Sequence, residues 1–327
     1  MVIDSHAHII VPEITRAAAP DEAWRPQVSW TGSGTLLEIN GRQQRSAIQP
    51  FTDIDMILEA QGPAGVDRIV LAPWVGLTGY DKDVDEGIRI SRIQNEALAR
   101  IAQEHAARVS VLGNVPLQEP EVAARELAEV MQLPGMVGVQ IATLVRGVYL
   151  GDDRFRPFWA AAEELGALVF IHPTMGGLSV SPFSEYYMQN SVGNPLETAI
   201  TAAHMVMAGV MEAHPALKVL LAHGGGALMS LRGRLRHAHS FQKQARARLQ
   251  EPVDASFKRF SYDTITHDVD LLRALVDYVG VDQLLCGSDY PFDMGAARPG
   301  EIVRQLGLDP VAEEKILSGN ARRIMGI

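Results

Sequence analysis

The hydrophobic positions of this chain form two alternating patterns, short apolar runs and longer stretches with helical spacing. The short runs predict strands at Val2–Asp4, Val66–Ala72, Val109–Asn114, Val137–Ile141, Leu168–His172, Lys218–His223, Phe260–Ile265 and Gln283–Asp289. The longer stretches predict helices at Asp85–Ala107, Glu121–Met131, Phe155–Leu165, Leu196–Ala213, Ala227–Leu249 and Val269–Val279. Eight strands alternating with helices predict an α/β fold of the (β/α)8 TIM-barrel type, because so regular a series favours a closed barrel over a doubly wound sheet.

The segment from Val11 to Thr52 interrupts this rhythm. It is rich in Pro and Gly and is too long for an ordinary loop between a strand and a helix. We interpret residues 11–52 as a small insertion after the first strand, a β-element or cap over the barrel mouth. Residues 1–327 then form a single barrel domain. A second long connection, Thr174–Asn194, follows the fifth strand and carries Tyr187.

Composition narrows the class of protein. The chain has 327 residues, of which 47% are hydrophobic and 21% charged, with a net charge of −10 and one cysteine. These values exclude a disordered chain and a disulfide scaffold, and the negative charge argues against a nucleic-acid partner. No run of about 18 apolar residues predicts a membrane span, and no secretory signal precedes the first strand. The lone Cys286 is typical of a reducing compartment, so we expect a cytoplasmic protein.

Five polar residues stand at the ends of predicted strands. His6 and His8 are two residues apart at the end of the first strand, so both rings face the same side. His172, His223 and Asp289 each follow an apolar strand and precede Gly, Pro or a short loop. Barrel enzymes build their sites at the carboxyl ends of the strands, where buried polar groups need partners. One shared metal ion and its water would satisfy all five residues, whereas separate structural roles would require five coincidences.

The arrangement His6-x-His8, His172, His223 and Asp289 on strands one, five, six and eight resembles the amidohydrolase superfamily. Finer motifs resemble its decarboxylase branch, typified by 2-amino-3-carboxymuconate 6-semialdehyde decarboxylase. These motifs are Gly138-Val139-Gln140-Ile141, Phe170-Ile171-His172-Pro173, Leu221-Ala222-His223-Gly224-Gly225-Gly226 and Gly287-Ser288-Asp289-Tyr290-Pro291-Phe292. The resemblance runs from residue 1 to about residue 320 and is weakest across the insertion.

The resemblance implies roles for the converging residues. His6, His8, His172 and Asp289 would hold the metal ion, and His223 would act as a base on a metal-bound water. Many superfamily members hold two metals with a carboxylated lysine on the fourth strand. Gln140 stands there in this chain, which favours one divalent ion, zinc in the first place and manganese in the second.

Two chemistries are open to a metal-bound water and a histidine proton shuttle. The first is nonoxidative decarboxylation of a small unsaturated or aromatic carboxylic acid, in which the substrate carbon is protonated and the bond to CO2 breaks. The alternative is metal-dependent hydrolysis of a lactone, amide or C–C bond on the same barrel. A barrel used only for binding is a third class, and the intact set of metal-ligand positions argues against it.

A carboxylate substrate needs fixed cations, and arginine is the usual choice for planar recognition. Arg45 in the insertion is one candidate, and Arg42, also in the insertion, is the next choice. Arg234, eleven residues after His223, is another, because an arginine at this spacing in the resembled enzymes enters the neighbouring subunit's site. That likeness implies a homodimer. Tyr187 is a candidate for stacking on a planar substrate.

Overall fold

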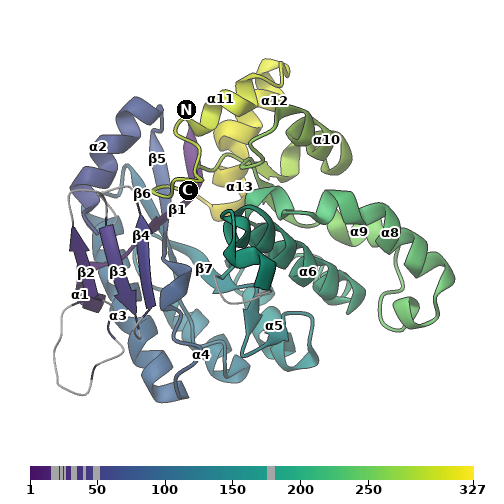
Figure 1. Cartoon of the computed structure of the whole chain (residues 1–327), viewed down its shortest axis with the longest axis horizontal. Helices are drawn as coiled ribbons and strands as arrows, with labels where there is room; N and C mark the ends of the chain where they lie inside the picture. The colour runs from purple at the N-terminus through teal and green to yellow at the C-terminus, as the bar shows by residue number, and fades with distance from the viewer. Residues whose placement is uncertain are drawn as a thin grey trace.

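Eight parallel strands form one sheet that curls into a barrel surrounded by helices in the computed structural model (Figure 1). In sheet order the barrel strands are β1 (Ile3–Ile9), β5 (Arg68–Pro73), β6 (Val109–Gly113), β7 (Met136–Ala142), β10 (Leu168–His172), β11 (Lys218–Leu221), β12 (Ser261–Asp263) and β13 (Leu284–Leu285). The structure describes residues 1–15, 22, 25, 27–30, 35–39, 42–46, 52–174 and 181–327, and for 27–30, 35–37, 39, 42–46, 181 and 182 it describes only the backbone. The predicted TIM barrel is confirmed.

The barrel closes between β1 and the chain that follows β13. The backbone N–H of Ser5 donates to the carbonyl of Cys286 at 2.8 Å, and that of His8 donates to the carbonyl of Tyr290 at 2.8 Å. The Asp4 carboxylate strengthens this junction, because it accepts hydrogen bonds from the backbone N–H and the hydroxyl of Ser288. Residues near both ends of the sequence therefore meet at one edge of the barrel.

The helices lie between successive strands, as the alternation of patterns predicts. The described residues form α1 (Pro12–Thr15), α2 (Ile54–Ala64), α3 (Val84–Glu104), α4 (Pro120–Val130), α5 (Arg156–Glu164), α6 (Asn194–Met207), α7 (Val210–Ala213), α8 (Leu228–Phe241), α9 (Val253–Phe257), α10 (Val269–Val279), α11 (Pro299–Arg304), α12 (Pro310–Glu314) and α13 (Asn320–Met325). Asp53, Asp83 and Asp268 accept hydrogen bonds from the first-turn N–H groups of α2, α3 and α10, so local capping fixes where these helices begin.

Several boundaries differ from the prediction. The first strand continues to Ile9, so it contains both His6 and His8 instead of ending before them. The stretch 196–213 forms two helices, α6 and α7, because Gly209 between them has a left-handed φ of 75°. The stretch 227–249 is α-helical only to Phe241 in α8, and a short 3-10 helix follows at Gln244–Arg246.

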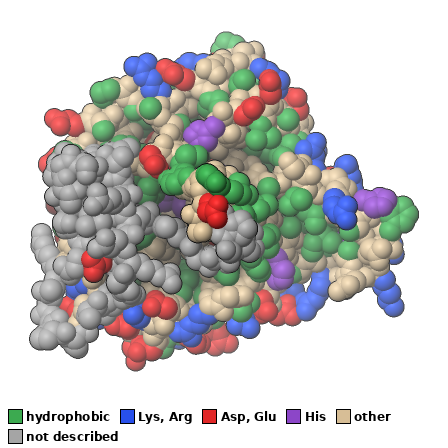
Figure 2. Space-filling view, viewed as in Figure 1, with side chains coloured by type: hydrophobic (Ala, Val, Ile, Leu, Met, Phe, Trp, Pro, Cys, Tyr) green, Lys and Arg blue, Asp and Glu red, His purple; other side chains and the backbone are tan. Residues whose placement is uncertain are grey.

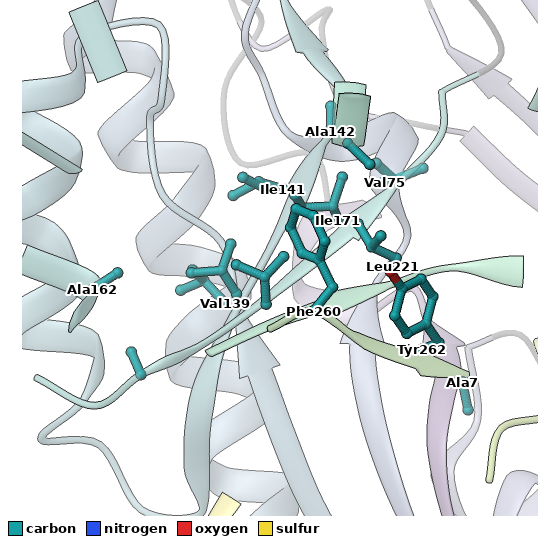
Figure 3. Close-up of a cluster of buried hydrophobic side chains, with 14 of the residues drawn as sticks. Ala7, Val75, Val139, Ile141, Ala142, Ala162, Ile171, Leu221, Phe260 and Tyr262 are labelled. Atoms are coloured by element: carbon teal, nitrogen blue, oxygen red, sulfur yellow. The ribbon is translucent and has the colours of Figure 1, made fainter. Parts of the chain in front are cut away.

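Side chains of the barrel strands alternate between two hydrophobic clusters. One cluster contains Phe170 and Leu220 together with Ile324 and Met325 of α13, and it fills the inside of the barrel. The other contains the intervening strand residues and packs them against the helices. Figure 3 shows part of this outer cluster, with Val139 and Ile141 of β7 near Ile171 of β10, Leu221 of β11 and Tyr262 of β12. At the carboxyl ends of the strands, by contrast, the side chains that face the lumen are polar.

Two small sheets lie outside the barrel. The insertion contains β2 (Gln27–Trp30), β3 (Thr35–Ile39) and β4 (Arg42–Ser46), which pair as an antiparallel sheet. A short hairpin joins β8 (Leu144–Val145) to β9 (Val148–Tyr149). The three insertion strands are drawn at the left of Figure 1. Whether the insertion covers the barrel mouth stays a prediction.

Charged groups are distributed mainly around the edge of the face in Figure 2, whose middle is largely hydrophobic. The arm at the right of this view contains α8 and α9 and carries Lys and Arg side chains. Across the described ranges, no helix combines the length and hydropathy that crossing a bilayer requires.

Candidate metal centre

Four histidines and one aspartate converge at the carboxyl ends of the barrel strands. His6 and His8 lie on β1, His172 is the last residue of β10, His223 follows β11, and Asp289 follows β13. The side chains of His6 and His8 are fully buried, and those of His172, His223 and Asp289 are at most 16% exposed. Because β1 extends through Ile9, the period of two along a strand directs both of its histidines into the lumen.

The distances among these side chains are those of a single centre. His6 Nε2 lies 3.1 Å from His8 Nε2, and each of these atoms lies 3.2 Å from Asp289 Oδ1. His172 Nε2 is 3.9 Å from the same Asp289 oxygen, and His223 Nε2 is 3.3 Å from Asp289 Oδ2. One atom from each of His6, His172, His223 and Asp289 lies within 4.8 Å of the others. The structure therefore brings together all five residues that the sequence singled out.

The hydrogen bonds of two histidines fix which ring nitrogen faces the centre. His172 Nδ1 lies 2.8 Å from the carbonyl oxygen of Pro173, which can only accept, so Nδ1 carries the hydrogen. His6 Nδ1 lies 2.7 Å from Oδ2 of Asp263 and donates to that carboxylate. Both rings consequently present Nε2 to the centre, which is the arrangement of a metal-ligating imidazole.

Burial and the Asp289 charge set the protonation of the group. Burial lowers the pKa of His172 to about 3 and also lowers that of His8, so both rings are neutral. Burial also acts to lower the pKa of His6, but the nearby charge of Asp289 and the hydrogen bond to Asp263 raise it to about 10. Burial acts to raise the pKa of Asp289, yet the histidines around it hold that pKa well below its usual range. The carboxylate of Asp289 thus stays ionised beside the neutral rings of His8 and His172, and its charge favours a cation at the centre.

The donor set fits a divalent metal ion. Within the described part of the chain, His8 Nδ1, His172 Nε2, His223 Nδ1 and Asp289 Oδ1 are buried atoms without a hydrogen-bond partner. An unpaired buried lone pair is costly, and His172 Nε2 and Asp289 Oδ1 both face the centre. Imidazole nitrogens with a carboxylate oxygen are ligands that zinc and neighbouring transition metals prefer. These residues form a site suited to one such ion.

Two further aspartates support the centre, and sequence patterns did not single them out. Asp263, the last residue of β12, accepts hydrogen bonds from the ring of His6 and the backbone of His223. Asp4 accepts from the backbone N–H groups of His6 at 3.1 Å and Ser288 at 2.9 Å. The signal available in the sequence was a carboxylate at the end of a buried strand, the same signal that identified Asp289.

The three residues expected to bind substrate lie on β4, on α8 and in the loop after β10. Arg45 lies on β4 opposite Leu36, but its side chain is outside the described residues. Arg234 is exposed on α8, the projecting helix of Figure 1. Tyr187 is 54% exposed, and its hydroxyl donates to Asp293 Oδ1 at 2.9 Å. That hydrogen bond ties the loop after β10, the strand that ends at His172, to the loop after β13, which also contains Asp289.

The sequence of this chain is similar to one family model and to several decarboxylases along most of its length. The family model described as amidohydrolase matches residues 3–327. A 2-amino-3-carboxymuconate-6-semialdehyde decarboxylase from Dictyostelium discoideum is 30% identical over 295 residues, which cover 89% of this chain and 81% of that protein. A 6-methylsalicylic acid decarboxylase from Penicillium expansum is 26% identical over 293 residues, covering 88% of this chain and 84% of that protein.

The fold is also shared with solved structures. The 5-carboxyvanillate decarboxylase of Novosphingobium aromaticivorans, complexed with manganese and 4-hydroxy-3-methoxy-5-nitrobenzoic acid, superposes with a TM-score of 0.85. The match covers 100% of this chain and 96% of that one at 19% identity. A likeness at this identity establishes the common barrel.

Proposed function

This chain belongs to the amidohydrolase family, in the branch of the 2-amino-3-carboxymuconate-6-semialdehyde decarboxylases, and from that membership we propose that it is a metal-dependent decarboxylase. Its substrate is a small unsaturated or aromatic carboxylic acid. The observation that carries the proposal is the convergence of four histidines and Asp289 at the carboxyl ends of the strands. The two relatives described above are both named decarboxylases, so the hydrolase alternative is not favoured.

We assign the metal-ligand role to His6, His8, His172 and Asp289, with zinc as the ion we expect and manganese as the second choice. The Nδ1 hydrogen bonds of His6 and His172 support this assignment, since they leave Nε2 available. A bound divalent ion supplies Lewis acidity, which lowers the pKa of a water molecule and polarises substrate oxygens. Binding of one ion, not two, is supported by Gln140 on the fourth barrel strand, because superfamily members with two metals have a lysine there. The Gln140 amide instead donates to the carbonyl of Pro73 on β5.

We assign the proton shuttle to His223. Its Nε2 donates to the Asp289 carboxylate, and no described residue partners its Nδ1, so Nδ1 is the ring nitrogen available to take up and release a proton. In the reaction a proton passes to the substrate carbon that bears the carboxylate. The bond to the carboxylate carbon then breaks, its electron pair restores conjugation, and CO2 leaves. His223 holds and delivers the proton, while Asp289 stabilises the imidazolium form at 3.3 Å.

We propose that Arg45 and Arg234 bind the substrate carboxylate and that Tyr187 stacks on its planar body. The partly exposed ring of Tyr187 and its anchor on Asp293, four residues after Asp289, support the stacking role. Arg234 has no partner among the described residues and lies on a projecting helix, which supports a role in the site of a second copy. The protein would then be a homodimer.

Two further proposals concern the setting of the enzyme. The antiparallel strands β2–β4 support the interpretation of residues 11–52 as a cap on a single barrel domain. The single cysteine, Cys286, is buried and free, which supports a cytoplasmic location.

A substrate screen tests the proposed function. Protein loaded with Zn²⁺ or Mn²⁺ is incubated with aromatic and muconate-like carboxylic acids, and both CO2 release and loss of absorbance are followed. We expect one class of acid to release one CO2 per molecule consumed, and metal-free protein to be inactive. A protein that leaves every acid intact but opens lactones or amides would be a hydrolase, and the proposal would be wrong.

A further inference from the structure

Asp263 makes an unusually complete set of hydrogen bonds beneath the metal centre. Its side chain is fully buried, and each carboxylate oxygen accepts two N–H groups. Oδ2 accepts from His6 Nδ1 at 2.7 Å and from the His223 backbone N–H at 2.8 Å. Oδ1 accepts from the backbone N–H groups of Gly224 at 2.8 Å and Ile265 at 3.0 Å. One side chain therefore connects the first, sixth and seventh barrel strands.

The bond to His6 determines the tautomer of that ring. An ionised carboxylate has no hydrogen to give, so His6 Nδ1 must be the donor. The Nε2 atom that remains faces His8 and Asp289 at 3.1 and 3.2 Å. If the Asp263 carboxylate were replaced by a donor, the ring would carry its hydrogen on Nε2, and Nε2 could no longer bind a metal.

The bonds to the backbone hold the turn that carries His223. His223 and Gly224 have φ values of 57° and 60°, and Gly225 and Gly226 continue in positive φ at 77° and 59°. A histidine rarely adopts this conformation, so the surrounding structure must impose it. The N–H groups of His223 and Gly224 both point to Asp263, which is the contact that keeps the turn in place.

We propose that Asp263 is the positioning residue that couples the two halves of this centre, fixing the ring of His6 for metal binding and the backbone of His223 for proton transfer. The proposal rests on the proposed function for the second half only, since the orientation of His6 concerns metal binding alone. Asp263 touches neither substrate nor the reacting atoms, and it acts through His6 and His223.

An amide cannot replace this carboxylate, although it has the same shape. Whichever way Asn is oriented at position 263, its NH2 group meets two N–H donors. In one orientation these are His6 Nδ1–H and His223 N–H, and in the other they are Gly224 N–H and Ile265 N–H. Relief in the first orientation requires His6 to move its hydrogen to Nε2, which weakens metal binding.

The test compares Asp263→Asn with Asp268→Asn. Asp268 caps α10 five residues further along and accepts a hydrogen bond from Leu271, away from the centre. Mn²⁺ alone is titrated into each metal-free protein by calorimetry, and circular dichroism checks the fold. We expect Asp263→Asn to bind Mn²⁺ about 10–100-fold more weakly than wild type, and Asp268→Asn to bind it as wild type does. At saturating Mn²⁺, Asp263→Asn should remain active, with a lower kcat than wild type and little change in KM.

A folded Asp263→Asn protein with wild-type Mn²⁺ affinity would overturn the proposal. If the variant does not fold, wild-type protein labelled with ¹⁵N-histidine and loaded with Zn²⁺ decides by NMR. We expect the His6 ring to show a protonated Nδ1 with a downfield hydrogen-bonded proton, and an unprotonated His6 Nδ1 would again overturn the proposal. Failure of the decarboxylase proposal looks different, because it leaves these metal-binding and NMR results unchanged while no acid releases CO2.

Discussion

His223 Nε2 lies 3.3 Å from Asp289 Oδ2, and both residues have left-handed backbone conformations, with φ of 57° and 59°. The two residues lie in the segments that follow β11 and β13, with β12 between these two strands in the sheet. A non-glycine residue in this conformation is strained, and strain of this kind gathers at functional sites. The pair is therefore the natural place to begin testing the proposed chemistry.

Replacing His223 by Asn should abolish proton transfer without removing the metal. We expect kcat to fall about 10²–10⁴-fold, the usual contribution of a general acid–base group, while metal content measured by mass spectrometry stays at one ion per chain. His237→Asn, on the exposed part of α8, is the matched control and should retain full activity. Loss of the metal from His223→Asn would instead make His223 a ligand.

Removing the metal should remove activity reversibly. A chelator is expected to eliminate CO2 release, and added Zn²⁺ or Mn²⁺ should restore it, because the orphaned Nε2 of His172 and Oδ1 of Asp289 need a cation between them. His172→Ala should lower the affinity for the ion by at least tenfold when measured by equilibrium dialysis. Activity that persists in metal-free protein would contradict the proposed mechanism.

Glu197 makes stability depend on pH. Burial raises the pKa of this carboxyl from 4.5 to about 7, although Thr143 and the N–H of Thr174 lower it somewhat. Between these values the native state keeps a proton that the unfolded chain releases, so the free energy of unfolding should fall as pH rises from about 4.5 to 7. The protonated carboxyl adds at most about 3 kcal/mol to the free energy of unfolding. This contribution is complete below pH 4.5 and is lost above pH 7.

The Glu197→Gln variant should abolish this slope. Urea unfolding at pH 5, 6, 7 and 8 is expected to give similar stabilities for variant and wild type at pH 5 and a more stable variant at pH 8. Glu164→Gln on the exposed face of α5 is the control and should follow wild type at each pH. Parallel curves for wild type and Glu197→Gln would contradict the assignment.

Tyr187 should influence substrate binding more than chemistry. Tyr187→Phe loses the hydrogen bond to Asp293, so the loop is held less firmly, and KM should rise about two- to tenfold with kcat unchanged. Tyr187→Ala also loses the ring and should raise KM further if the ring stacks on substrate. Tyr186→Phe is the control, because Tyr186 is 88% exposed. Steady-state kinetics on the acid found in the screen measure both constants, and an unchanged KM for Tyr187→Ala excludes the stacking role.

Arg234 should act from a second subunit. Arg234→Ala is expected to raise KM about tenfold or more, the size of one lost charge-assisted hydrogen bond, without changing the mass seen by analytical ultracentrifugation. Mixing Arg234→Ala with inactive His223→Asn should recover part of the activity, because one mixed site then holds both intact residues. A monomeric protein, or a mixture without recovered activity, would argue against the shared site.

Much of the barrel could be predicted because its strands follow from local sequence patterns. Apolar runs such as Val169-Phe170-Ile171 are typical of strands buried on both faces, and a polar residue directly after such a run, as at His172, indicates a carboxyl end. The parallel sheet then brings residues 6 and 8 together with residues 172, 223 and 289, although these four segments are far apart in the chain. This is why the set of five converging residues could be named before the structure.

Other features depend on contacts that no local pattern encodes. Asp263 is separated from His6 by 257 residues, and its other partners are backbone groups that every residue possesses. The break between α6 and α7 depends on Gly209, and a single Gly is common inside helices, so its left-handed conformation could not be foreseen. The length of β1 depends on pairing with β5, whose register shifts between Asp4 and Ala7.

The junction between β1 and the chain after β13 has a consequence for biosynthesis. Because synthesis runs from the N-terminus, Asp4 and His6 leave the ribosome long before their partners Ser288 and Asp289. A nascent chain that lacks β12, β13 and the loop after β13 has neither the Asp263 partner of His6 nor Asp289, the last residue of the proposed ligand set. Under the proposed assignment, metal capture is therefore delayed until Asp289 has been made, and a product that ends before Asp289 would lack the ion.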